Sequence, residues 1–183
     1  MKRLVLFVFV ATIFLTACNS PEGKPEEKKE SKQTVLTKSG LFDKIGQNEK
    51  SLFSDKSARI NKKSALELVE DYQQFANRFP KDTLAPEYLF KASDISMNLG
   101  RPRVTVNIFN RLISDYPDFN KISTCYFLRA FVYDDQLKDY VKAEKYYKDF
   151  LERFPDSEFA DDAQMLMKNM GKSPEQLIKD FGE

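Results

Sequence analysis

Residues 147–155 read YKDFLERFP, and two earlier stretches follow the same pattern: YQQFANRFP at 72–80 and FNRLISDYP at 109–117. Each stretch places large apolar side chains three and then four residues apart and ends in an aromatic residue followed by proline. Apolar residues at these spacings share one face of a helix, and a proline stops a helix. The three stretches therefore predict three amphipathic helices that each end at a proline.

The three prolines are 37 and then 38 residues apart, which indicates one repeating unit. An aspartate follows each proline within two residues: Asp82, Asp118 and Asp156. Each unit would present an aromatic face that it cannot bury alone, and stacking on the next unit hides that face. The sequence therefore predicts an all-α fold, a short α-solenoid of about three helical hairpins with flanking helices.

Other helix breakers divide the rest of the chain. Gly100 with Pro102, and Gly171, separate segments of about 12 to 18 residues, which is an ordinary helix length. We expect a leading helix near residues 41–56 and a final helix near 173–181. No strand-like alternation of apolar and polar residues competes with this interpretation.

The repeating pattern over residues 62–170 resembles the tetratricopeptide repeat family, whose helical hairpins end at a proline. Small residues are favoured at two further positions of that family, and the corresponding residues here are Leu68, Thr105, Ala143, Ser93 and Ala130. Within the family, the aromatic-proline endings are similar to two kinds of envelope protein: the lipoprotein subunit of the outer-membrane β-barrel assembly machinery and the Tol-Pal coordinator protein. The resemblance implies a scaffold that binds another envelope protein or a peptide.

The first 17 residues have the pattern of a signal peptide. Lys2 and Arg3 precede an apolar run from Leu4 to Ala17, which stops at Cys18. A helix of this length rises about 21 Å, less than the roughly 30 Å hydrocarbon core of a bilayer. We therefore expect residues 1–17 to be removed rather than to remain as a spanning helix.

The residues before the predicted cleavage site, Leu15-Thr16-Ala17-Cys18, resemble the lipobox of bacterial lipoproteins. The resemblance implies a bacterial source, cleavage after Ala17 and acylation of Cys18. Asn19 stands where an aspartate would signal inner-membrane retention in enterobacteria, which favours an outer-membrane anchor with the domain in the periplasm. The alternative is an ordinary secretory signal that happens to leave a cysteine.

Residues 19–38 combine two prolines, one glycine and many charges with almost no apolar side chains, which predicts a flexible linker at 18–40 ahead of a helical repeat domain at 41–183. The charged run 26–30 could instead direct the lipoprotein to the cell surface. A plain solvated linker is the favoured interpretation.

Composition excludes several classes of function. The chain carries 29 basic and 28 acidic residues, so it lacks the basic excess typical of nucleic-acid-binding proteins. It contains no histidine, which removes the Ser-His-Asp and Cys-His catalytic sets and the His-based zinc sites. Its glycines form no phosphate-binding loop. We expect no enzymatic activity, no cofactor, no metal and no nucleic-acid partner.

The remaining reactive side chains fit structural roles. Cys125 occupies a repeat position that we expect to be packed inside the domain. The pairs Asp134-Asp135 and Asp161-Asp162 are adjacent residues, which point about 100° apart on a helix, so we expect them to be solvated rather than to bind a metal.

The expected binding surface is formed by the first helices of the units, near residues 84–99 and 120–134. Tyr88, Tyr126 and Arg129 are the candidate anchors for a partner, although aromatic residues at helical spacing usually belong to the core. The sequence thus predicts a lipid-anchored scaffold that mediates protein–protein interaction in the bacterial envelope, in outer-membrane assembly or envelope integrity. The alternative is a lipid-anchored protein that captures a glycan or peptide, and the absence of tryptophan counts mildly against it.

Overall fold

The computed structural model describes residues 37–54 and 61–181; the predicted signal peptide, Cys18 and most of the predicted linker lie outside this part. The described elements are α1 (Lys38–Ser54), α2 (Lys62–Arg78), α3 (Leu84–Asn98), α4 (Pro102–Asp115), α5 (Ile122–Phe131), the π-helix η1 (Val132–Gln136), α6 (Tyr140–Arg153), α7 (Ala160–Asn169) and α8 (Pro174–Phe181). This part contains no strand, which confirms the all-α prediction. None of these helices combines the length and apolar character needed to cross a bilayer.

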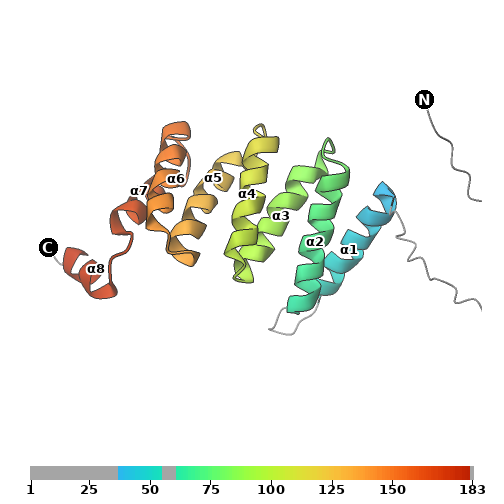
Figure 1. Ribbon diagram of the computed structural model, residues 1–183, viewed down its shortest axis with the longest axis horizontal. Helices are drawn as coiled ribbons and strands as arrows, with labels where there is room; N and C mark the ends of the chain where they lie inside the picture. Colours follow the sequence, from blue (N-terminus) through green and yellow to red (C-terminus); the bar gives the residue numbers. More distant parts are fainter. Residues whose placement is uncertain (1–36, 55–60, 182–183) are drawn as a thin grey trace, which may run out of the picture. The chain divides into compact units, whose positions relative to one another are not determined.

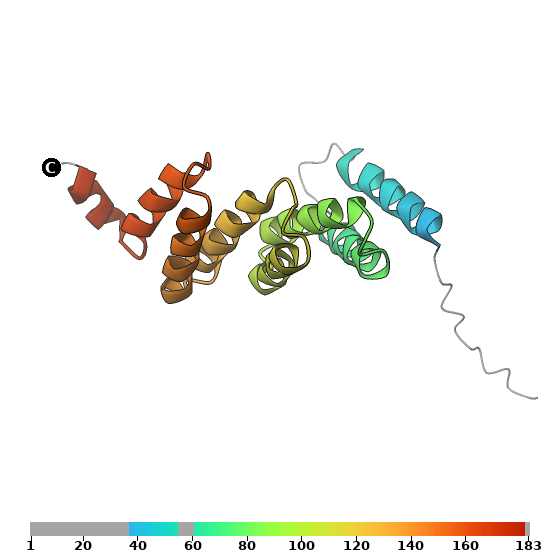
Figure 2. The same ribbon diagram turned by 90° about the horizontal axis from the view of Figure 1, so that it is seen from above.

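The helices pair as three successive hairpins: α1 with α2, α3 with α4, and α5 with α6. The second helix of each hairpin also contacts the first helix of the next, so α2 packs on α3, α4 on α5, and α6 on α7 (Figure 1). Seen from above, α2, α4 and α6 lie on one side of the stack and α1, α3, α5 and α7 on the other (Figure 2). The solenoid prediction is confirmed, and the expected leading helix is the first helix of the first hairpin.

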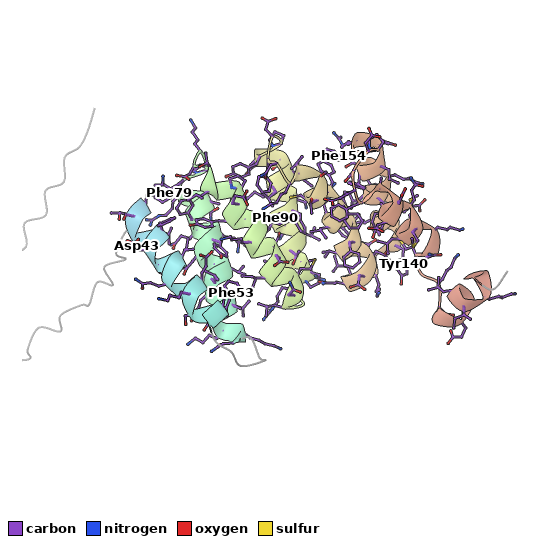
Figure 3. The ribbon with its side chains drawn as sticks, turned by 180° about the vertical axis from the view of Figure 1, so that it is seen from behind. Asp43, Phe53, Phe79, Phe90, Tyr140 and Phe154 are labelled. Atoms are coloured by element: carbon purple, nitrogen blue, oxygen red, sulfur yellow. The ribbon has the colours of Figure 1, made fainter. Side chains whose placement is uncertain are left out.

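The three aromatic-proline pairs end their helices in the same way. Phe79, Tyr116 and Phe154 have φ values of −128°, −135° and −133°, and each backbone N–H donates to the carbonyl four residues earlier. Figure 3 shows Phe79 and Phe154 at corresponding ends of α2 and α6. The next residue is proline, which cannot donate the following helical hydrogen bond, so the chain turns at the same point in each hairpin.

The predicted aromatic face forms the core. Six side chains of this face are at most 1% exposed: Tyr72, Phe75, Phe109, Leu112, Tyr147 and Phe150. Two clusters of buried side chains result, one from α1 to η1 and one from α5 to α7, and Leu128 and Tyr133 pack against both. Burial is therefore shared between neighbouring hairpins, as in other repeat proteins.

Polar contacts add to the packing of α1. Asp71 on α2 accepts hydrogen bonds from Lys44 Nζ at 2.6 Å and Asn48 Nδ2 at 2.8 Å. Glu49 accepts from the Tyr72 hydroxyl at 2.6 Å and from Lys91 Nζ at 2.7 Å. Burial alone would raise the pKa of Glu49, but the hydrogen bonds from Lys91 and Tyr72 outweigh it and hold the pKa below its usual range. Glu49 therefore stays charged and joins α1 to α2 and α3.

The extra residue of the longer repeat lies in η1. Val132–Gln136 forms a π-helix, and the Leu137 N–H donates to the carbonyl of Val132, five residues earlier. One inserted residue is commonly accommodated in a helix by such a π turn. The hairpin turn consequently falls at Lys138, which has a φ of 52°, whereas the preceding hairpin turns at Gly100 with a φ of 65°.

Candidate functional site

Two hollows lie between α4 and α6, and side chains from α5 and η1 form the base of the space that joins them. Tyr126, Arg129 and Tyr133 reach from α5 and η1 into this space, because Arg129 bonds to both α4 and α6 and the two tyrosines contact α6 side chains. We call this space, with these three side chains and the facing residues of α4 and α6, the Arg129 groove.

The groove distinguishes the third hairpin from the second. At the corresponding positions of α3, 37 residues earlier, stand Leu89, Ala92 and Ser96, all at most 1% exposed. Small and apolar side chains there allow α2, α3 and α4 to pack closely. In α5 and η1 two tyrosines and an arginine occupy these places, and amphipathic side chains of this kind keep a polar end near solvent.

Arg129 is the central residue of the groove and is only 7% exposed. Its Nη1 donates to Asn110 Oδ1 and its Nη2 to Asp149 Oδ2, both at 3.2 Å. The guanidinium carbon lies 5.1 Å from the ring centroid of Tyr126 and 4.0 Å from that of Tyr146. Its Nε is buried and has no hydrogen-bond partner in the described part of the chain. Buried donors are normally paired, so the unpaired Nε makes Arg129 a candidate for binding a ligand as well as for packing.

Aromatic rings and cations extend on both sides of Arg129. Towards η1, the Tyr146 ring lies 5.1 Å from Tyr133, and Lys142 Nζ lies 5.4 Å from the Tyr133 ring centroid. Towards the end of α6, Arg153 lies 5.5 Å from the Tyr126 ring, and its Nε donates to Asp149 Oδ1 at 2.7 Å. Each cation–π contact at an exposed site contributes about 0.5–1 kcal/mol, so the row is held in place by its own contacts.

An open hollow lies at each end of this row. The hollow near η1 has a volume of about 490 Å³, and its lining includes Arg103, Val106, Asn107, Tyr133, Leu137 and Lys142. The other has a volume of about 350 Å³ and is lined by Ile113, Pro117, Ile122, Tyr126, Arg153 and Phe154. The first hollow combines charged and polar groups, Asp139 among them, with Val106 and Leu137, whereas the second combines one cation, Arg153, with apolar and aromatic side chains. The two ends of the groove therefore favour different side chains.

The structure brings two of the three predicted anchors together, because Arg129 lies over the Tyr126 ring. The prediction of Tyr88 as an exposed anchor needs correction. Its side chain is 5% exposed, its ring stacks on Tyr72 at 5.1 Å, and it meets Phe75 edge-on at 4.8 Å. Tyr88 therefore belongs to the core.

The predicted direction of Tyr126 and Arg129 is also corrected, because both face the second helices α4 and α6 rather than a surface of first helices. Four residues of the candidate site were not among the predicted anchors: Tyr133, Tyr146, Asn110 and Asp149. The spacing of 126, 129 and 133 did carry a signal, since residues three and four apart share a helix face. Nothing local in the sequence shows which residues of α4 and α6 lie opposite that face.

The other reactive groups of the described part are structural. No group of His, Cys, Asp and Glu side chains there could hold a metal ion. Cys125 is fully buried, as expected, and burial raises the pKa of its thiol to about 12. The expectation of a solvated Asp134 is wrong: it is half-buried, it accepts a hydrogen bond from the Tyr147 hydroxyl at 3.4 Å, and burial raises its pKa.

The stacked hairpins and the groove define the class of helical-repeat domains. The tetratricopeptide repeat profile matches residues 124–157, from the start of α5 to the turn after α6. This match supports a tetratricopeptide-repeat protein and a protein–protein interaction scaffold, and it includes Tyr126, Arg129, Tyr133 and the groove residues of α6. A comparison with curated proteins finds no match to the chain.

Proposed function

We propose that the protein is a lipid-anchored scaffold of the bacterial envelope, which binds a segment of another envelope protein in the Arg129 groove. The observation that carries this proposal is the buried Arg129 guanidinium between two tyrosine rings, inside the segment that matches the repeat family. Arginine and tyrosine are the side chains most enriched at the energetic centres of protein interfaces. A role in outer-membrane assembly or envelope integrity follows from the resemblance to envelope proteins with similar repeats.

The proposed anchor is a set of acyl chains on Cys18. Its support is the lipobox-like sequence Leu15-Thr16-Ala17-Cys18, preceded by a charged and then apolar leader. Each buried methylene group contributes about 0.8 kcal/mol to membrane binding, and more than one chain gives stable anchoring. Asn19 favours the outer membrane, with the helical domain in the periplasm.

The anchor is tested by intact mass and membrane fractionation of the expressed protein. We expect a mature chain that begins at an acylated Cys18 and sediments with membranes. The Cys18→Ala variant should be neither acylated nor retained there. An uncut or unlipidated native chain contradicts the anchor, although it leaves the groove and its partner untouched.

The binding site is tested by photocrosslinking in cells. A photoreactive amino acid replaces Asn107, which lines the hollow near η1, or Lys145 on the adjoining face of α6; both side chains are exposed. We expect each to crosslink to the same envelope protein. The matched control replaces Gln74, an exposed residue of α2, and should give no such product. Equal crosslinking from Gln74, or none from the groove, contradicts the proposed site.

The alternative function, capture of a glycan or free peptide, predicts a different result. Calorimetry with oligosaccharides would then give heat that saturates at one site per protein. The same groove variants distinguish the two functions, because a captured small ligand leaves no protein crosslink.

A further inference from the structure

We infer that the Arg129 groove recognises an acidic segment of its protein partner: carboxylate side chains, with a bulky apolar side chain three to five residues away in an extended chain. This inference rests on the proposed function, since it names the chemistry of the segment that the groove binds. It follows from three features of the groove: its charge, the unpaired donor of Arg129 and the unlike ends.

The first feature is an excess of positive charge. The three hollows that the groove residues line carry six cations, Arg103, Arg129, Lys142, Lys145, Lys148 and Arg153, and four carboxylates, Asp139, Glu144, Asp149 and Glu152. Asp139 pairs with Lys142 at 2.6 Å, and Asp149 pairs with Arg129 and Arg153. Arg103 and Lys145 form no ion pair with a described residue. Because the whole chain is nearly neutral, with 29 basic and 28 acidic residues, this local excess selects an acidic partner.

The second feature is the buried Nε of Arg129, which lacks an acceptor. A guanidinium has five N–H donors in a fixed plane, and Arg129 uses its two Nη groups for Asn110 and Asp149. A carboxylate oxygen that enters the groove supplies the missing acceptor only after a side chain that covers this Nε moves aside, so we expect binding to shift a neighbouring ring. Charge-assisted hydrogen bonds to a carboxylate are stronger than those to a neutral carbonyl, which favours aspartate or glutamate over an amide side chain.

The third feature is the contrast between the ends of the groove. The hollow with Ile113, Pro117, Ile122 and Phe154 suits a bulky apolar side chain, whereas the hollow with Arg103 and Lys142 suits a carboxylate. The α5–η1 residues at the two ends are 7 to 11 positions apart, about 10–16 Å along a helix. An extended chain covers that distance in about three to five residues.

The wall formed by α4 suits an extended peptide backbone. Asn107 and Asn110 are exposed and lie one helical turn apart on α4. The Asn110 Oδ1 already accepts from Arg129, so its amide group still has donors to offer. Side-chain amides can bond to peptide groups of any sequence, so they hold the segment while the two ends select its side chains. A lipid phosphate would satisfy the cations but would leave the apolar hollow and the asparagines unused.

The inference is tested by selecting random 12-residue peptides from a display library on the mature full-length protein in detergent. We expect enrichment of peptides with Asp or Glu three to five residues from Phe, Leu or Trp. Fluorescence anisotropy of one enriched peptide should show a loss of affinity of at least about tenfold for the Arg103→Glu/Lys145→Glu double variant, equivalent to roughly 1.4 kcal/mol. Added salt should weaken binding to the native protein.

The matched control is the double variant Lys50→Glu/Lys63→Glu, which makes the same charge change at exposed residues of α1 and α2. It should bind the peptide as the native protein does. A peptide with Lys in place of its acidic residues should recover affinity for the Arg103→Glu/Lys145→Glu variant, because the attraction is restored with reversed signs.

Three results overturn the inference: peptides enriched without an acidic excess, no enrichment, or equal losses in both double variants. A fourth result overturns it in favour of a lipid: the native protein binds phosphatidylglycerol vesicles and does not bind the peptides. The proposed function fails separately. If the groove crosslinks to a partner through a segment that is not acidic, the proposed scaffold function stands and this inference fails. If the groove selects acidic peptides but crosslinks to no protein in cells, the specificity for acidic segments stands and the proposed envelope function fails.

Discussion

Lys138 adopts the left-handed backbone conformation that Gly100 adopts in the preceding hairpin, with φ values of 52° and 65°. Both residues follow a leucine and stand at the turn between the two helices of a hairpin. Glycine tolerates this conformation, whereas a residue with a Cβ atom pays about 1–2 kcal/mol. The third hairpin therefore contains a strained residue at a place where the second does not.

Replacing Lys138 with glycine should stabilise the protein. Removing the strain stabilises the folded chain, and the larger entropy of the unfolded glycine chain offsets part of this gain. The ion pair with Asp135 is 3.7 Å long and exposed, so its loss costs little. We expect the free energy of unfolding in urea to rise by up to about 1 kcal/mol. The complementary change, Gly100→Ala, should lower it by about 1–2 kcal/mol. A stabilising Gly100→Ala would contradict this assignment.

A charged side chain at Phe150 should unfold the domain or nearly so. Phe150 is fully buried and packs on Phe127 and Phe154. Phe150→Asp creates a cavity and buries an unpaired charge, so we expect a loss of at least about 4 kcal/mol in thermal or urea unfolding. Phe53→Asp is the matched control, because Phe53 is 67% exposed, and it should change stability by less than about 0.5 kcal/mol. Equal effects would undo the repeat alignment.

Arg129→Met should separate binding from folding. Position 129 corresponds to Ala92 in the second hairpin, so an apolar side chain fits the stack. Asp149 keeps its bond to Arg153 and is 31% exposed, so it is not left buried and alone. We expect unfolding in urea to change by less than about 1 kcal/mol, while crosslinking from Asn107 is lost. A loss above about 3 kcal/mol would show that Arg129 mainly supports the fold.

The Cys125 thiol should make stability fall at alkaline pH. Burial raises its pKa from 9.0 to about 12, so the folded state holds the proton more tightly than the unfolded state. This contribution is complete below about pH 9 and is lost as the pH rises towards 12. Burial raises the pKa of Tyr72 and Tyr147 too, with the same sign. In a Cys18→Ala background, the thiol should react with a chromogenic disulfide reagent at pH 8 in urea but not in buffer.

Replacing Cys125 with alanine measures how much of the alkaline loss of stability comes from the thiol. The Cys125→Ala variant should lose less stability than its parent between pH 8 and 10.5, since the tyrosines alone then respond. Fast labelling of the folded parent in buffer at pH 8 would contradict the buried position.

Much of the fold was predictable because its signals are local. Tyr72, Phe109 and Tyr147 stand at one spacing from their prolines, and a helix turns such spacing into a shared face. The surroundings of Tyr88 and Arg129 could not be predicted. A period of three to four residues shows which side chains share a helix face, but it does not show which other helix covers that face. The π turn at Val132–Gln136 was hidden too, because a spacing of 38 in place of 37 residues does not say where the extra residue lies.

The two core clusters meet at Leu128 and Tyr133, and we expect the domain to separate at this junction into two cooperative units in denaturant. In denaturant the α5–α7 side can melt while α1 to α4 hold, because each side buries its own rings. The groove crosses that junction, with one wall on α4 and the other on α6. A bound segment touches both units, so the two units should unfold together when the groove is occupied. The denaturation curve should then show one sharp transition in place of two.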